Sequence, residues 1–181
     1  MTKVIKMVSG SALRYMVDFV EEKKGAYGRE EFTRRVNEKN VIVPKIEAID
    51  PDDEFSPGYF ERVLDATAKT LKDESLLNQL GYNYGKKFSS PGIRLFSPFE
   101  KNERVILSVC EHIKKYTPTF NVSYEALSDK KFVIRINNIK NKEQSVFLSG
   151  YLEALLKKVQ KKIMKVEEDS GDNKKIVIKF L

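Results

Sequence analysis

The clearest structural signal in the chain lies in residues 120–180, which read FNVSYEALSDKKFVIRINNIKNKEQSVFLSGYLEALLKKVQKKIMKVEEDSGDNKKIVIKF. Four runs in this stretch alternate apolar and polar residues with period two, as half-buried strands do, namely residues 120–124, 132–137, 163–168 and 176–180. Turn residues follow the first and third runs at 128–130 and 170–173. A helix is expected between the hairpins, from about Lys142 to Val159, opened by Asn141 and Gln144. This order predicts an antiparallel sheet with helices on one face.

The residues before this stretch are predicted to be mainly helical. Helical patterns begin near Ser11, Arg29, Ser56, Asp73 and Ser97. Gly25 suits the end of the first helix, Ser56-Pro57 and Asp73 are start signals, and Ser97-Pro98-Phe99-Glu100 has the form of a capping box. The fold class is therefore α+β. Residues 1–181 are expected to form one domain, in which a helical part (1–116) packs on a β-β-α-β-β part (117–181).

Composition and the N-terminal sequence indicate the cellular compartment of the protein. The chain has 181 residues, enough for one self-sufficient core, and its single cysteine, Cys110, cannot form an internal disulfide. Lys3 and Lys6 interrupt an N-terminus that is too short for a signal peptide. No apolar run is long enough to span a membrane. These features predict a cytoplasmic protein.

Positive charge is concentrated in the second half of the chain. Residues 1–90 are balanced, so residues 91–181 carry the whole formal charge of +7. The lysines predicted to form a basic surface are Lys157, Lys158, Lys161, Lys162 and Lys165. Such a surface can attract nucleic acid or another anionic partner, although a solvated lysine-rich surface gives the same pattern. No aromatic residue interleaves these lysines, which makes nucleic acid the less favoured partner.

The sequence contains no recognisable catalytic or metal motif. His112 is the only histidine, and Cys110 lies two residues away on the same predicted helix, where the two side chains diverge. No phosphate-binding glycine loop occurs, and the carboxylate clusters fall in predicted loops and turns. We therefore predict no catalytic residue, no metal and no cofactor, and a protein that is not an enzyme.

Glycines and aromatic residues in the middle of the chain could form a ligand site. Gly81 and Gly85 share one face of a predicted helix, where they permit either close packing of another backbone or space for a ligand. Phenols in an apolar pocket are typical of small-molecule sites. The residues predicted to line such a pocket are Tyr59, Phe60, Gly81, Tyr82, Tyr84, Gly85 and Phe96.

Four stretches resemble one known superfamily. They are the helix from Ser11 to Gly25, Pro57-Gly58-Tyr59-Phe60, Leu80-Gly81-Tyr82-Asn83-Tyr84-Gly85 and Leu148-Ser149-Gly150-Tyr151-Leu152. In this order they resemble the superfamily of haem nitric-oxide/oxygen-binding domains, V4R domains and TRAPP subunits, most closely a haem-less bacterial branch. The haem-binding members carry a proximal histidine and a Tyr-x-Ser-x-Arg pattern; this chain lacks the pattern, and nothing else in the sequence supports His112 as a proximal ligand. The metal-binding V4R members use several cysteines, and this chain has one. The resemblance therefore implies the fold, an apolar pocket and dimerisation through helices, without haem or zinc.

The function that follows is a sensor or adaptor domain for signalling. It is expected to bind a small apolar ligand or a protein partner, with a homodimer as the expected assembly. The alternative function is binding of nucleic acid or an anionic partner through the basic C-terminal half.

Overall fold

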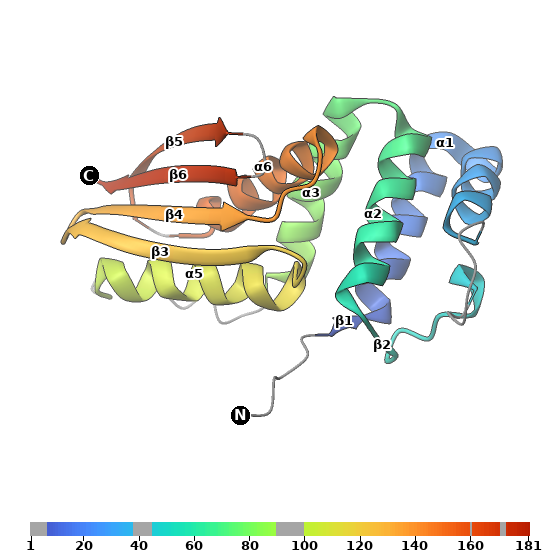
Figure 1. The fold of residues 1–181 in the computed structure, drawn as a ribbon, viewed down its shortest axis with the longest axis horizontal. Coiled ribbons are helices and arrows are strands. Elements are labelled where there is room, and N and C mark those ends of the chain that lie inside the picture. The colour runs from blue at the N-terminus through green and yellow to red at the C-terminus, as the bar shows by residue number, and fades with distance from the viewer. Residues whose placement is uncertain (1–6, 38–44, 90–99, 160, 171–172) are drawn as a thin grey trace.

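The computed structural model describes residues 7–37, 45–89, 100–159, 161–170 and 173–181 (Figure 1). Helices α1 (Gly10–Asn37) and α2 (Pro57–Leu71) lie at one end of the molecule, and α3 (Glu74–Phe88) lies in the middle. The other end contains α5 (Asn102–Tyr116), α6 (Lys142–Lys157) and the strands β3 (Asn121–Ser128), β4 (Lys131–Asn137), β5 (Ile163–Ser170) and β6 (Asn173–Phe180). The α+β class and the order of elements predicted from the sequence are confirmed.

The sheet has four antiparallel strands in the order β3-β4-β6-β5. Each predicted hairpin forms, and the two hairpins join where β4 pairs with β6, with Ile134 opposite Ile176. Strand β3 extends past its predicted end at Tyr124 to Ser128, with a register shift between Ala126 and Ser128. A β-bulge of this kind bends the strand near the hairpin turn.

One face of the sheet forms the core of this part, and we call it the inner face. Phe132, Ile134 and Ile136 of β4 are buried there, as are Ile176 and Ile178 of β6. Helix α5 covers this face near β3, since the Tyr124 hydroxyl lies 3.2 Å from the Glu103 carboxylate. Helix α6 covers it near β6, where Lys174 reaches Ser145 and Ser149. Both helices therefore lie on one face, as predicted.

Helix boundaries agree in part with the sequence signals. Gly25 has a φ of 68° and interrupts α1, which joins the two predicted N-terminal helices. Asp73 caps α3 by accepting hydrogen bonds from the backbone amides of Ser75 and Leu76. Asn141 likewise accepts from the amide of Gln144 at the start of α6. These three signals are confirmed.

Two predicted helix starts have different outcomes. Pro57 is the first residue of α2 and Ser56 is its N-cap, but the Ser56 side chain makes no capping hydrogen bond. The predicted capping box begins at Ser97, outside the described residues, and α5 begins at Asn102 with Lys101 as its N-cap. Helix α5 thus starts later than the capping box predicted.

The structure also contains a short two-stranded pairing that the sequence did not predict. Strand β1 (Val8–Ser9) pairs with β2 (Glu54–Phe55), and this brings the start of α1 to the segment before α2. A 3-10 helix (Ile46–Ala48) packs on α1, and its Ile46 is buried. Among the described residues, no helix is long and apolar enough to cross a membrane.

Candidate functional site

The aromatic residues predicted to line a pocket lie in the packed interior. Tyr59 and Phe60 of α2 and Tyr84 of α3 have exposed fractions of 4%, 0% and 0%. The Phe60 and Tyr84 rings lie 5.6–6.3 Å from the ring of Phe147 on α6, by their centroids. The Tyr84 hydroxyl donates to the Tyr116 carbonyl at 3.0 Å, and burial raises its pKa. These rings therefore pack as part of the hydrophobic core, in which the buried Tyr84 hydroxyl has a hydrogen-bond partner.

The two predicted glycines lie where α3 and α6 cross. A Cβ atom added at Gly81 would lie 2.0 Å from the Phe147 carbonyl oxygen, and one at Gly85 would lie 2.9 Å from the Tyr151 carbonyl oxygen. Gly150 contributes from α6, since its Cβ would lie 2.0 Å from the Asn78 carbonyl oxygen. The geometry therefore favours the close-packing alternative for these glycines.

The two other predicted pocket residues lie elsewhere. Tyr82 is partly exposed on α3, with the Lys157 ammonium 5.0 Å from its ring centroid. Phe96 lies outside the described residues. None of the predicted pocket residues lies in the wall of the three cavities of about 810, 290 and 30 Å³ that described residues line. A ligand pocket at these positions therefore stays a prediction.

His112 on α5 is buried and has partners for both ring nitrogens. Nε2 lies 3.0 Å from the Phe88 carbonyl oxygen, and Nδ1 lies 2.7 Å from the Tyr151 hydroxyl oxygen. Because a carbonyl only accepts, Nε2 carries the proton and Nδ1 accepts from the hydroxyl. Burial lowers the pKa of His112 to about 4, and the bond to Phe88 offsets this only in part. His112 is therefore a neutral link between α3, α5 and α6.

This environment does not fit an axial haem ligand. Coordination needs a ring nitrogen whose lone pair is directed at the metal. The Nδ1 lone pair of His112 is used by Tyr151, and the Nε2 proton is donated to Phe88. Aromatic rings also surround the imidazole, with the centroid of Tyr116 at 4.5 Å. Within the described part of the chain, no group of three His, Cys, Asp or Glu residues could hold a metal ion.

Most of the predicted basic surface is engaged in contacts within the protein. Lys157 pairs with Glu153 at 2.7 Å, and Lys165 pairs with Glu167 at 2.5 Å. Lys158 donates to the carbonyl oxygens of Lys86 and Ser89 at 2.9 and 3.1 Å, and Lys161 donates to the Asn102 side chain at 2.8 Å. Lys162 is exposed. The five lysines therefore do not form one continuous free surface.

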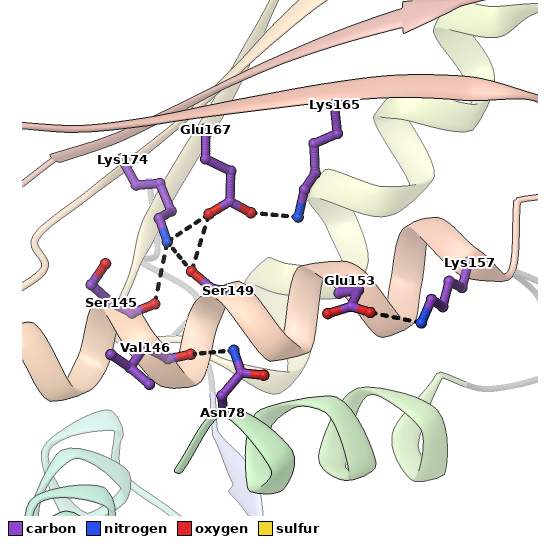
Figure 2. Close-up of polar contacts among 9 residues, drawn as sticks. All are labelled: Asn78, Ser145, Val146, Ser149, Glu153, Lys157, Lys165, Glu167 and Lys174. Atoms are coloured by element: carbon purple, nitrogen blue, oxygen red, sulfur yellow. Dashed lines mark hydrogen bonds and ion pairs between the residues drawn. The ribbon is translucent and has the colours of Figure 1, made fainter. Parts of the chain in front are cut away.

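A buried charged cluster that the sequence analysis missed lies between β5, β6 and α6 (Figure 2). Lys174 of β6 is 1% exposed. Its ammonium contacts the Ser145 carbonyl oxygen at 3.2 Å, the Ser149 hydroxyl, and the Glu167 carboxylate at 3.1 Å. Burial would raise the pKa of Glu167, but Lys165 and Lys174 outweigh it and lower the pKa.

The signal that could have revealed this cluster is the strand period. Lys174 lies two residues before Ile176, so it belongs to the same buried face of β6. On β5 the paired inner positions are Lys165, opposite Ile178, and Glu167, opposite Ile176. Glu167 lies in the predicted strand run 163–168, but its carboxylate was expected to be solvated. In the structure β5 extends to Ser170 and the Glu167 carboxylate points toward α6.

A small cavity lies beside this cluster, between the C-terminal end of α6 and the start of β5, and we call it the α6–β5 cavity. It has a volume of about 290 Å³. Its apolar wall consists of Leu156, Val159 and Ile163, and its polar rim consists of Glu153, Lys157, Lys161 and Lys165. Three of the predicted basic residues thus surround an apolar depression.

A larger cleft of about 810 Å³ lies between the start of α5 and the β3–β4 turn. Its wall is mostly polar and includes Lys101, Asn102 and Ser128. Lys161 borders both cavities. Polar surface predominates in this wall, in which Ala126, Leu127 and Phe132 are the apolar residues, so the cleft is the poorer match to a small-molecule site.

Comparison with known proteins identifies the fold. No family model and no curated protein matches the sequence. Solved H-NOX (haem nitric-oxide/oxygen-binding) structures do match it. An Fe(II) unliganded H-NOX protein from K. algicida has a TM-score of 0.63 and 14% identity, covering 96% of this chain and 97% of its own. A mutant of T. tengcongensis H-NOX has a TM-score of 0.62 and 16% identity, with coverages of 96% and 97%.

A third match is an oxygen-binding H-NOX domain related to soluble guanylate cyclases, in its oxygen complex. Its TM-score is 0.58 at 12% identity, with coverages of 96% and 95%. The chain therefore has an H-NOX-like α+β fold over nearly its whole length. The family resemblance found in the sequence is confirmed at the level of the fold. Membership of a haem-less branch stays a prediction.

Proposed function

We propose that this chain is a non-enzymatic sensor or adaptor domain that binds a small apolar ligand or a protein partner without using haem. The H-NOX-like fold supports a ligand-sensing domain, since one matched structure is that of an oxygen-binding H-NOX domain. The observation that carries the haem-free part is His112, whose ring nitrogens are both used by Phe88 and Tyr151. The fold is suited to sensing, and both ring nitrogens of His112 are used in internal hydrogen bonds. A ligand other than haem is therefore favoured.

The test is haem loading of the full chain. The protein is expressed with added haem precursor, and separately titrated with hemin, while the Soret absorption is recorded. We expect no stoichiometric Soret band, and native mass spectrometry of the protein purified from cells should show any retained small molecule. A one-to-one haem complex whose spectrum changes in His112→Ala would overturn the proposal.

We extend the proposal to a homodimer that uses the outer face of the sheet. Met164 and Val166 of β5 are 49% and 47% exposed, and Val166 lies opposite the partly exposed Val177 of β6. The charged Lys165 and Glu167 point inward from the same edge strand, a device that discourages edge-to-edge pairing. Contact through the apolar strip of Met164, Val166 and Val177 on the outer face is thus favoured over extension of the sheet.

A second candidate function is binding of an anionic partner at one end of the sheet. Lys131 and Lys179 lie opposite each other, and the carbonyls of Lys130 and Lys162 bond the backbone amides of Phe180 and Leu181. These four lysines are exposed, and their ammonium groups have no partner among the described residues. They support a positive surface that includes only Lys162 of the predicted five.

Nucleic acid is the partner that can be tested directly. Fluorescence anisotropy with single-stranded DNA or RNA should show affinity that falls steeply with added salt, because phosphate contacts release counterions. The Lys131→Met/Lys179→Met double variant should bind more weakly than the parent. Absence of binding at low salt would remove this candidate.

A further inference from the structure

We propose that the α6–β5 cavity binds a small amphipathic anion, with its aliphatic tail on Leu156, Val159 and Ile163 and its carboxylate among the rim lysines. This inference rests on the proposed function and gives it a ligand class. The volume of about 290 Å³ is at the lower end of the range for small-molecule sites. A short or medium aliphatic chain fits that size better than a ring system such as a porphyrin.

The apolar wall favours a hydrocarbon tail. Leu156 and Val159 are each 6% exposed, and Ile163 is partly buried against the core. Leu156 lies in the last turn of α6 and Ile163 is the first residue of β5, so the main-chain elements on both sides hold the wall in place. A tail that covers this wall removes apolar surface from water, which stabilises the complex roughly in proportion to the area covered.

The rim favours a negative head group. Lys157 and Lys165 each have a carboxylate partner, Glu153 and Glu167. Lys161 differs, because among the described residues its ammonium contacts only neutral groups: the Glu100 carbonyl oxygen, the Asn102 side-chain oxygen, and the Phe180 ring at 5.7 Å. The rim has three lysines and one glutamate, and Lys165 shares Glu167 with Lys174, so the rim is net positive and attracts an anionic head group.

The hydrogen-bonding capacity of Lys161 is consistent with such a ligand. An ammonium group has three donors, and Lys161 uses two of them on Glu100 and Asn102. The third can serve a carboxylate, as a charge-assisted hydrogen bond that is stronger than one between neutral groups. A neutral alcohol would lose this contact, and a cation would be repelled.

The position of the cavity also provides a route for a signal. Lys165 lies between the cavity and the buried cluster, since its partner Glu167 also contacts Lys174 and Ser149 (Figure 2). An anion that competes for Lys165 would weaken its pairing with Glu167. The contact between β5 and α6 would change as a result.

The test uses the full chain and isothermal titration calorimetry with sodium hexanoate, octanoate and decanoate. Neutral 1-octanol and cationic octyltrimethylammonium are the control ligands, since they have the same eight-carbon chain as octanoate and differ in the charge of the head group. We expect octanoate to bind more tightly than either, and affinity to rise by up to about fourfold per added CH₂ until the tail outgrows the wall.

Two neighbouring lysines give the matched variants. Lys161→Met keeps an apolar stem but removes the charge, and it should weaken octanoate binding about tenfold, the loss typical of one charged contact. Lys162→Met changes an exposed lysine that does not border the cavity and should leave affinity within about twofold. Thermal melting checks that both variants are folded.

The inference is overturned if octanoate does not bind, if 1-octanol binds equally well, or if Lys162→Met has the same effect as Lys161→Met. After any of these results, the proposed function as a haem-free sensor is still supported if native mass spectrometry detects another small ligand. Stoichiometric haem binding through His112 would instead remove the proposed function, whatever octanoate does.

Discussion

His112 is the residue whose surroundings bear most directly on ligand chemistry. Its Nδ1 and Nε2 atoms are held by Tyr151 of α6 and Phe88 at the end of α3. A buried histidine in a protein with this fold suggests a cofactor ligand. The hydrogen bonds of His112 instead connect α5 to α3 and α6. That His112 ligates neither a metal nor haem stays a prediction, which the haem titration tests.

The burial of His112 predicts a pH-dependent stability. Its pKa is lowered to about 4, whereas in the unfolded chain it is near 6.5. Between these values the unfolded state binds the proton and the folded state does not, so stability is lost as the pH falls from about 6.5 to about 4. The loss should reach roughly 3 kcal/mol.

Urea unfolding at several pH values measures this effect. The fall should be smaller in His112→Gln, because glutamine does not titrate and the remaining change comes from carboxylates. If parent and variant show the same pH profile, the imidazole is not neutral in the folded protein.

Gly81 and Gly150 lie at the closest approach of α3 and α6, where a Cβ atom would lie 2.0 Å from a carbonyl oxygen of the opposite helix. Gly81→Ala and Gly150→Ala should each lower the free energy of unfolding by about 2–3 kcal/mol, because the backbones must separate. Gly58→Ala is the control, since its nearest neighbour is 4.0 Å away, and it should be neutral or stabilising by up to about 1 kcal/mol. Equal effects at all three positions would contradict the close crossing.

At the scale of single elements, the caps of α2 and α3 give a matched pair. Asp73 accepts hydrogen bonds from the amides of Ser75 and Leu76 at 2.8 and 3.2 Å. Ser56 makes no side-chain capping bond. Asp73→Ala should therefore cost about 1 kcal/mol in thermal or urea unfolding, and Ser56→Ala clearly less. A larger loss of stability in Ser56→Ala than in Asp73→Ala would mean that α2, and not α3, depends on its N-cap.

Strand β6 offers a second comparison, between adjacent lysines on opposite faces. Lys174 is buried against Glu167, whereas Lys175 forms an exposed pair with Glu168. Lys174→Met should cost about 2–4 kcal/mol, because Lys165 is then the only ionic partner that Glu167 keeps within the described part of the chain. Lys175→Met should cost less than about 1 kcal/mol.

The double variant Lys174→Met/Glu167→Leu separates charge from packing in this cluster. Replacing both members of a buried pair with apolar residues is often nearly neutral. We expect the double variant to recover part of the loss seen in urea unfolding of Lys174→Met. A double variant less stable than Lys174→Met would show that Glu167 contributes through Ser149 or Lys165 instead.

At the scale of the whole molecule, substitutions can test which surface forms the proposed dimer interface. Met164→Lys/Val166→Lys on the outer sheet face should convert a dimer into a monomer in sedimentation velocity, with little change in melting temperature. Leu107→Lys is the control, because Leu107 is 39% exposed on α5 and not on that face. Dissociation by Leu107→Lys alone would instead favour the helix-mediated dimer that the family resemblance implies.

Much of this architecture follows from local sequence patterns. The period-two runs around Phe132 and Ile176 predicted the strands, and Asp73, Asn141 and Gly25 marked the starts and the break of helices that the structure contains. Such signals depend on residues within a few positions of one another, and neighbours along the chain remain neighbours after folding. The α+β class could therefore be predicted without coordinates.

The candidate site could not be predicted in the same way. The pairing of Lys174 with Glu167 and the occupation of both His112 nitrogens join residues 7–39 positions apart, which only the packed helices and strands bring together. A lysine run such as 157–165 looks like one basic surface until β5 turns Lys165 inward and α5 engages Lys161. Composition and period determined which segments become strands and helices. Tertiary packing alone decided which charges remain free, because each charge is compensated by whatever segment the fold places beside it.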